Sequence, residues 1–290
     1  MNKTVRTISA AIIIFALSAS SAVALARSDK EKLKPEEVIA KHLEALGAAE
    51  ARAAAGNRVI TGTAVVTFRQ GGKGQLQGSA RVVSESQKSL ISMAFDSIDY
   101  PHEKLGFDGT KFTVSQVRPG VRTILGRYLL TNEWVFKEGL IGGALSSAWP
   151  LADIAAKNAK VQYDGIKKVN NRQLHQLKYS PKKGTSLKAT IFFDPETFQH
   201  VRSQYQQTLD PTVAAGRPGE SVGQEETKVN IVEEFSDFKA EAGLNLPHTY
   251  KLTLEIVGPS GSLLYEWVLT FQKFSFTEPI DAKEFNVDLQ

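Results

Sequence analysis

Two segments near the C-terminal end of the chain alternate apolar and polar residues. Residues 250–256 carry Tyr, Leu, Leu and Ile at every second position, and residues 263–271 carry Leu, Tyr, Trp, Leu and Phe in the same way. Successive side chains of a strand point to opposite faces. Both segments therefore predict strands of a sheet that has one apolar face. That face is large and aromatic, so it either forms a protein core or covers something bound from outside.

The first 26 residues have the parts of a secretory signal peptide. Lys3 and Arg6 form the basic region, residues 8–17 are apolar, and residues 24–26 read Ala-Leu-Ala, a small-residue cleavage site. The apolar run is shorter than the roughly 20 residues that span a bilayer. We therefore expect cleavage after Ala26 and export to the periplasm, with an uncleaved anchor as the alternative.

The chain contains no cysteine. This excludes disulfides, thiolate metal sites and cysteine nucleophiles, as well as lipidation at a cysteine behind the signal. After cleavage the chain would contain 33 basic and 31 acidic residues, because Lys3 and Arg6 are removed with the signal peptide. The basic residues are dispersed, which argues against a nucleic-acid partner. We expect a monomer whose hydrophobic core alone holds it together.

The remaining pattern predicts β-structure with few helices. A helix is expected over residues 36–46, between Pro35 and Gly47. Residues 58–117 and 160–238 read as strands joined by short turns. The Gly- and Pro-rich residues 210–227 predict a flexible loop. No repeat or linker divides the chain, so residues 27–290 are expected to form a single domain.

One helical block interrupts the strands. Apolar residues recur near helical spacing between residues 127 and 150, while three glycines break the run and Pro150 ends it. We expect this block to act as a lid over the apolar face of the sheet.

No motif for catalysis, metal binding or cofactor binding is present. The five histidines do not stand in metal-ligand spacing, and neither a GxSxG elbow nor a phosphate-binding loop occurs. Asp194 and Glu196 flank Pro195, which favours a turn over an acid–base pair. Glu103 follows His102 in an apparent connection and is expected to be solvated. We therefore predict no catalytic residue, no metal and no cofactor, and a protein that is not an enzyme.

Several large apolar residues are candidates for a shared surface. Each of them alone would be ordinary core, but a curved sheet covered by few helices can enclose a ligand cavity. The candidate cavity lining is Trp134, Ile141, Trp149, Tyr205, Tyr250, Leu252, Leu254, Tyr265, Trp267 and Leu269.

Five short motifs resemble, in order, those of the LolA-like family, the outer-membrane lipoprotein-sorting and carrier superfamily. They comprise an opening helix, a central hairpin, an Asp-Pro-Glu-Thr turn, a second hairpin with Gly-Leu-Asn-Leu-Pro, and a closing Ile-Asp-Ala-Lys-Glu-Phe piece. They lie at residues 35–47, 165–179, 192–197, 235–247 and 280–285. The chain looks longer than the carriers, with residues 127–150 and 210–227 as additions.

The resemblance implies a mainly β fold with a few helices (α+β), in which a curved antiparallel sheet forms a half-open barrel closed by helices. Better-known members of the family carry lipoprotein acyl chains across the periplasm, while other proteins of this architecture are envelope stress regulators. Two hypotheses follow. The first is a periplasmic carrier that holds the acyl chains of a lipid or lipoprotein in an apolar cavity. The second is an envelope sensor or scaffold with a filled core, whose partners are envelope membrane proteins.

Overall fold

Twelve antiparallel strands form one sheet in the computed structural model, which describes residues 33–69, 73–209, 226–259 and 261–289. The described residues belong to one compact unit. From one edge of the sheet to the other, the strands are β5 (Phe112–Val114), β4 (His102–Phe107), β3 (Lys88–Phe95), β2 (Lys73–Glu85), β1 (Asn57–Arg69), β12 (Gly261–Ser275), β11 (Leu244–Gly258), β10 (Thr227–Glu241), β9 (His200–Leu209), β8 (Lys188–Phe193), β7 (Arg172–Ser180) and β6 (Lys160–Val169).

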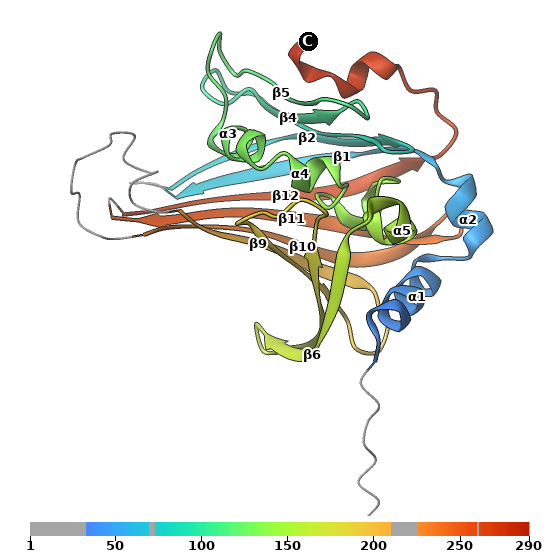
Figure 1. Cartoon of the computed structure of the whole chain (residues 1–290). Coiled ribbons are helices and arrows are strands. Elements are labelled where there is room, and N and C mark those ends of the chain that lie inside the picture. The colour runs from blue at the N-terminus through green and yellow to red at the C-terminus, as the bar shows by residue number, and fades with distance from the viewer. Residues whose placement is uncertain (1–32, 70–72, 210–225, 260, 290) are drawn as a thin grey trace, which may run out of the picture. The chain divides into compact units, whose positions relative to one another are not determined.

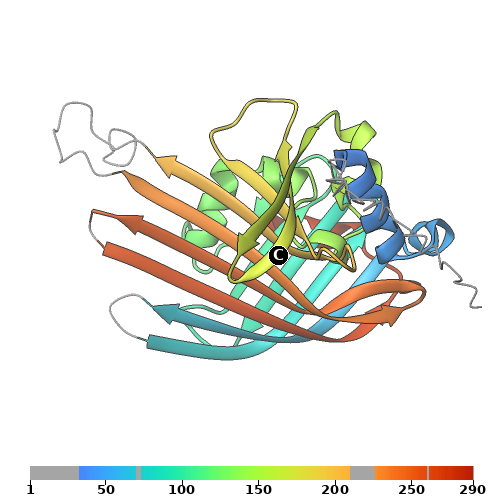
Figure 2. The same ribbon diagram turned by 90° about the horizontal axis from the view of Figure 1, so that it is seen from below.

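This order consists of two meanders that meet in the middle of the sheet. Strands β1–β5 form one meander and β6–β12 form the other. The two halves join only where β1 pairs with β12, the last strand in the chain. Figure 2 shows this junction, where the blue β1 lies beside the red β12. The long strands β10–β12 carry the alternation that the sequence predicted.

Most helical segments lie inside the curve of the sheet. Figure 1 shows α3, α4 and α5 between β4 and β5 at one edge and β6 at the other. The helical segments are α1 (Pro35–Leu46), α2 (Ala49–Ala54), α3 (Ile124–Thr131), α4 (Trp134–Lys137), α5 (Ile154–Lys157) and the short 3₁₀ helices η1 (Gly143–Leu145), η2 (Pro150–Asp153), η3 (Ala282–Phe285) and η4 (Val287–Leu289). None of these helices is long and apolar enough to cross a bilayer.

Glycines allow the central strands to approach each other closely where the sheet bends. The β1–β12 register shifts between Thr61 and Gly62, and such a bulge bends a strand and increases its twist. A Cβ on Gly62 would lie 2.0 Å from the Thr270 carbonyl oxygen. On the next strand, a Cβ on Gly78 would lie 1.9 Å from the Ala94 carbonyl oxygen. Larger residues at these two positions would force neighbouring strands apart.

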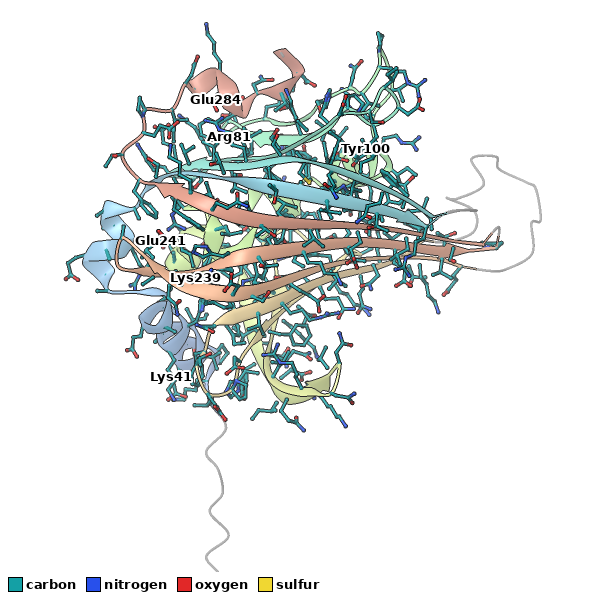
Figure 3. All side chains as sticks on the ribbon, turned by 180° about the vertical axis from the view of Figure 1, so that it is seen from behind. Lys41, Arg81, Tyr100, Lys239, Glu241 and Glu284 are labelled. Carbon is teal, nitrogen blue, oxygen red and sulfur yellow. The ribbon has the colours of Figure 1, made fainter. Side chains whose placement is uncertain are left out.

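The outer face of the sheet is polar along β9–β12 and covered near β1–β3. Alternating charges cross β9–β12 as Arg202, Glu234, Lys251 and Glu266. At the other half, the C-terminal segment packs Phe285 and Val287 on a small cluster that includes Val59 of β1. Glu284 of this segment pairs with Arg81 of β2, and Figure 3 shows the two side by side.

The structure confirms a mostly β fold with few helices. The sheet is strongly curved and open, because β5 and β6 stand at opposite ends of the strand order among the described residues. The expected first helix is α1, and the expected helical block is a series of short pieces, with Gly139 and Gly142 between α4 and η1. The signal segment and residues 210–225 of the expected loop lie outside the described residues.

Candidate functional site

The concave face of the sheet brings together the apolar residues that the sequence singled out. Strand register aligns them in rows across neighbouring strands, so they form a continuous wall. The pairs on β11 and β12 are Tyr250 with Leu269, Leu252 with Trp267, and Leu254 with Tyr265. Tyr205 of β9 continues the last row through Ile231 of β10.

All ten candidate cavity residues lie in one hydrophobic cluster. Eight of them are at most 3% exposed, while Trp134 and Tyr265 are only partly buried. Trp134, Ile141 and Trp149 come from the segment that covers the wall, which we call the helical block (residues 123–151). The other seven come from strands β9, β11 and β12.

The helical block fills the space above the wall with its own side chains. Phe136, Leu140 and Leu145 are at most 1% exposed and join the same cluster as the wall. Beside the block, a void lined by His42 and His200 has a volume of about 10 Å³. That is close to the minimum that holds one water molecule. The concave face is therefore covered by the protein itself in this structure.

A buried carboxylate joins the helical block to the wall. Glu233 of β10 is completely buried. Its Oε1 accepts hydrogen bonds from the Gly142 backbone N–H and the Tyr250 hydroxyl, both at 2.7 Å, and its Oε2 accepts one from the Tyr205 hydroxyl at 2.7 Å. Burial raises the pKa of the Glu233 carboxyl to about 7 because it disfavours the charged form.

A second buried carboxylate holds the start of the block. Glu103 of β4 accepts hydrogen bonds from Thr123 Oγ1 and from the Tyr100 hydroxyl, both at 2.7 Å. Thr123 also caps α3 by accepting the Gly126 N–H, and Trp267 Nε1 donates to the Tyr100 oxygen. Burial raises the pKa of Glu103 to about 7.

The expectation that Glu103 is solvated is wrong, because it points inward from a strand and is 1% exposed. Tyr100 is labelled in Figure 3.

Two buried histidines hold the end of the block. Trp149 Nε1 donates to His42 Nε2 at 3.0 Å, and His42 Nδ1 donates to the Phe198 carbonyl at 3.1 Å. His200 stacks on Trp149 with ring centroids 4.6 Å apart. Burial lowers the pKa of His42 to about 4 and that of His200 well below its usual value. Both rings are therefore neutral and serve as hydrogen-bonding and stacking partners of the block.

An open groove lies at the other side of the block. It has a volume of about 670 Å³ and runs between α3–α4 and the loop that joins β7 to β8. Trp134 is the candidate cavity residue that lines it, and Lys157, Lys182 and Lys183 line it as well. A neighbouring hollow of about 420 Å³ lies across the same loop.

The described residues contain no group of three or more His, Asp or Glu side chains that could hold a metal ion. The turn interpretation of Asp194 and Glu196 is confirmed. Asp194 Oδ1 accepts the backbone N–H groups of Glu196 and Thr197, both at 3.1 Å.

Sequence reasoning missed the two buried carboxylates, although one of them leaves a signal. Residues 229–235 of β10 place Val229, Ile231 and Phe235 on the inward face, and Glu233 is the fourth inward position. A charged residue in register with an apolar stripe is a sign of a buried polar cluster, because it must find partners there.

Neither a protein-family model nor a curated protein matches the chain. Solved structures do match. A LolA superfamily protein from Nitrosomonas europaea is 10% identical, with a TM-score of 0.46 over 88% of this chain and 98% of that one. A DUF1329 family protein from Desulfovibrio piger is 12% identical, with a TM-score of 0.42 over 86% and 97%. A chain from a complex of MucA and MucB from Pseudomonas aeruginosa is 11% identical, with a TM-score of 0.23 over 84% of this chain and 100% of that one. The first structure carries the name of the family that the sequence motifs resemble.

Proposed function

We propose that the protein binds an acyl chain of a lipid or lipoprotein on the concave face of its sheet, and that the helical block leaves this face when the chain enters. The observation that carries the proposal is the pairing of a continuous apolar wall with a separate segment that covers it. Each methylene buried on such a wall contributes about 0.8 kcal/mol. No catalytic group is needed for this function.

The composition of the block supports an exchange with an acyl chain. The block covers the wall with Phe136, Leu140 and Leu145, so an acyl chain would replace one apolar surface by another. Its helices are short, at 8 residues for α3 and 4 for α4. Helices of this length are not stable without packing. Gly139 and Gly142 have φ of 83° and 85°, which are left-handed conformations suited to chain reversal.

The sequence supports an envelope location for this activity. The first 26 residues have the pattern of a signal peptide, and the absence of cysteine fits a mature protein without lipidation. We therefore place the proposed activity in the periplasm, in a single domain over residues 27–290.

A reversible crosslink tests the proposal directly. Ser147 of the block donates its backbone N–H to Ser84 Oγ at 2.9 Å, and its hydroxyl to the Ser86 carbonyl at 3.1 Å. A Ser84→Cys/Ser147→Cys variant brings two thiols within reach of a disulfide, in a chain that otherwise lacks cysteine. Uptake of an uncharged fluorescent fatty-acid methyl ester is measured in the oxidised and the reduced protein, with each single cysteine variant as a control.

We expect the oxidised double variant to take up no methyl ester and the reduced form to regain the uptake of the unmodified protein. The single variants should respond to neither oxidation nor reduction. If the reduced protein takes up no methyl ester and no lipid is extracted from protein purified from the periplasm, the acyl-binding function is wrong.

A filled core favours a second candidate, an envelope sensor or scaffold. The 10 Å³ void and the hydrogen bonds of Glu233, Glu103 and His42 are what a permanently docked block would show. This function needs no movement of the block. It predicts that the oxidised crosslinked variant still captures the same membrane-protein partner by crosslinking in the envelope, whereas the acyl-binding function predicts a loss of cargo.

A further inference from the structure

We propose that the groove between the helical block and the β7–β8 loop is a second binding site, which takes a single-chain amphiphile with an anionic phosphate or carboxylate headgroup. This site goes beyond the concave face, because the groove is open while the block is docked.

The size of the groove suits a small ligand. Its volume of about 670 Å³ lies within the roughly 300–1,000 Å³ of typical ligand pockets. One wall consists of Thr131, Asn132 and Trp134, at the end of α3 and the start of α4. The other wall is the β7–β8 loop from Pro181 to Ser186. Gln207 of β9 lies between the walls, where it accepts the Tyr128 hydroxyl at 2.9 Å.

The charge of the groove selects an anion. Lys157, Lys182 and Lys183 line it, and Lys178 and Lys188 line the neighbouring hollow across the same loop. Glu138 is the single acidic residue in either lining, and its Oε2 is engaged by the Tyr179 hydroxyl at 2.7 Å. Lysine side chains bind phosphate and carboxylate groups as compact positive charges.

Two of these lysines are available to a ligand. Lys182 and Lys183 are exposed on the β7–β8 loop and form no ion pair with any residue that the structure describes. Lys157 is partly buried, and its Nζ donates to Gln87 Oε1 at 2.5 Å. Burial lowers the pKa of Lys157, so an anion beside it would stabilise the charged form.

The apolar part of the groove suits the first part of an acyl chain. Trp134 is partly exposed on one wall, and Pro181 stands on the other. The hydrocarbon stems of Lys182 and Lys183 extend this surface, because lysine buries its stem while its charge stays in water. An amphiphile can thus place its headgroup among the lysines and its chain against Trp134.

The test compares three probes on the full mature chain by isothermal titration calorimetry. The first is monomeric lysophosphatidylglycerol, the second is lysophosphatidylcholine with the same chain, and the third is inorganic phosphate. We expect the anionic lysolipid to bind at least tenfold more tightly than the zwitterionic one, with a preference that falls as salt is raised. Inorganic phosphate alone should bind at least tenfold more weakly.

Matched variants assign the binding to the groove. Lys182→Ala/Lys183→Ala should remove most of the preference for the anionic lysolipid. Lys168→Ala/Lys273→Ala removes two exposed lysines that line neither hollow, and should keep it. Trp134→Phe should abolish the change in tryptophan fluorescence that the lysolipid causes. The oxidised Ser84→Cys/Ser147→Cys variant should bind the lysolipid as the unmodified protein does, because the groove does not need the block to move.

Four results with the reduced protein and its lysine variants would overturn this site. They are no binding of the anionic lysolipid, equal loss of preference in both lysine pairs, phosphate binding as tight as lysolipid binding, and binding to anionic vesicles without binding of monomers. Loss of lysolipid binding in the oxidised crosslinked variant would also contradict it, since the ligand would then occupy the concave face. Failure of methyl-ester uptake alone leaves the groove unaffected, because the ester carries no anionic headgroup, so the two proposals fail separately.

Discussion

The backbone N–H of Gly142 donates to Glu233 Oε1 at 2.7 Å and joins the helical block to strand β10 deep inside the protein. The same carboxyl accepts the hydroxyls of Tyr205 and Tyr250. One side chain therefore connects the covering segment to three strands of the wall. A buried acceptor shared by three donors makes all of them depend on it.

Removal of this carboxyl should destabilise the fold. Glu233→Ala leaves a backbone N–H and two hydroxyls buried without an acceptor, and each such group costs about 1–3 kcal/mol. We expect the free energy of unfolding to fall by at least about 3 kcal/mol in urea denaturation. Glu255→Ala, at an exposed position on β11, is the control and should change it by less than about 0.5 kcal/mol. Equal midpoints for the two variants would contradict the role of Glu233.

The pH dependence of stability should reveal the two buried carboxyls. Their pKa values are raised from 4.5 to about 7, so the folded protein holds these protons more tightly than the unfolded chain does. Their contribution to stability is fully present below pH 4.5 and is lost as the pH rises to about 7. In Glu103→Gln/Glu233→Gln this loss disappears. Urea midpoints measured from pH 4.5 to 7.5 should therefore rise more steeply with pH in the variant, and parallel curves would rule the assignment out.

The buried histidines act in the opposite direction. The pKa of His42 is lowered from 6.5 to about 4, so the unfolded chain takes up a proton first as the pH falls. The contribution of neutral His42 is present above pH 6.5 and is lost between pH 6.5 and 4. We expect His42→Gln to reduce the decrease in the urea midpoint between pH 6.5 and pH 4. His248→Gln, at a histidine of β11, serves as the comparison, and identical curves for the two variants would contradict the prediction.

Two tryptophan-to-phenylalanine substitutions should differ in how much they destabilise the protein, although the chemical change is the same. Trp149→Phe removes the donor to His42 Nε2 and replaces the indole on which His200 stacks by a smaller ring. We expect a loss of about 1–3 kcal/mol in the free energy of unfolding. Trp134 Nε1 has no hydrogen-bond partner among the described residues. Trp134→Phe should therefore lower the free energy of unfolding clearly less. A larger effect at Trp134 in urea denaturation would place the anchoring contact of the block elsewhere.

A glycine in the central strand pair should tolerate no side chain. A Cβ on Gly62 would lie 2.0 Å from the Thr270 carbonyl oxygen, which is backbone of the paired strand and cannot turn away. Gly62→Ala should therefore lower the free energy of unfolding by about 1–3 kcal/mol or prevent folding. Gly184→Ala is the control, because nothing lies within 4 Å of its added Cβ. Soluble Gly62→Ala protein with an unchanged midpoint would contradict this account of the bulge.

The sequence predicts the strands of this fold better than the contents of its concave side. Alternation identifies β11 and β12 because their period of two is uninterrupted, and Pro35 and Gly47 mark the ends of α1 within one residue. The same alternation says which way Trp267 faces but not what lies opposite it. The packing of residues 123–151 against the wall depends on distant pairs such as Gly142 with Glu233, which no local pattern encodes.

The burial of Glu103 is a second example of this limit. Pro101 and His102 before it suggest a connection, yet β4 begins at His102 and turns Glu103 inward. Its partners Thr123 and Tyr100 come from the start of the helical block and from the loop before β4. The groove likewise depends on how the β7–β8 loop lies against α4, and of its lining residues only Trp134 was singled out from the sequence, and for the concave face instead.

The meeting of β1 with β12 has a consequence for how the protein is made. The first strand pairs with β2 directly behind it, but its other neighbour exists only when residues 261–275 have been synthesised. The junction between the two halves of the sheet is therefore completed last. Pairings between such distant strands form slowly. On the export route that the N-terminal pattern predicts, the sheet would therefore be completed only after the last strand has crossed the membrane.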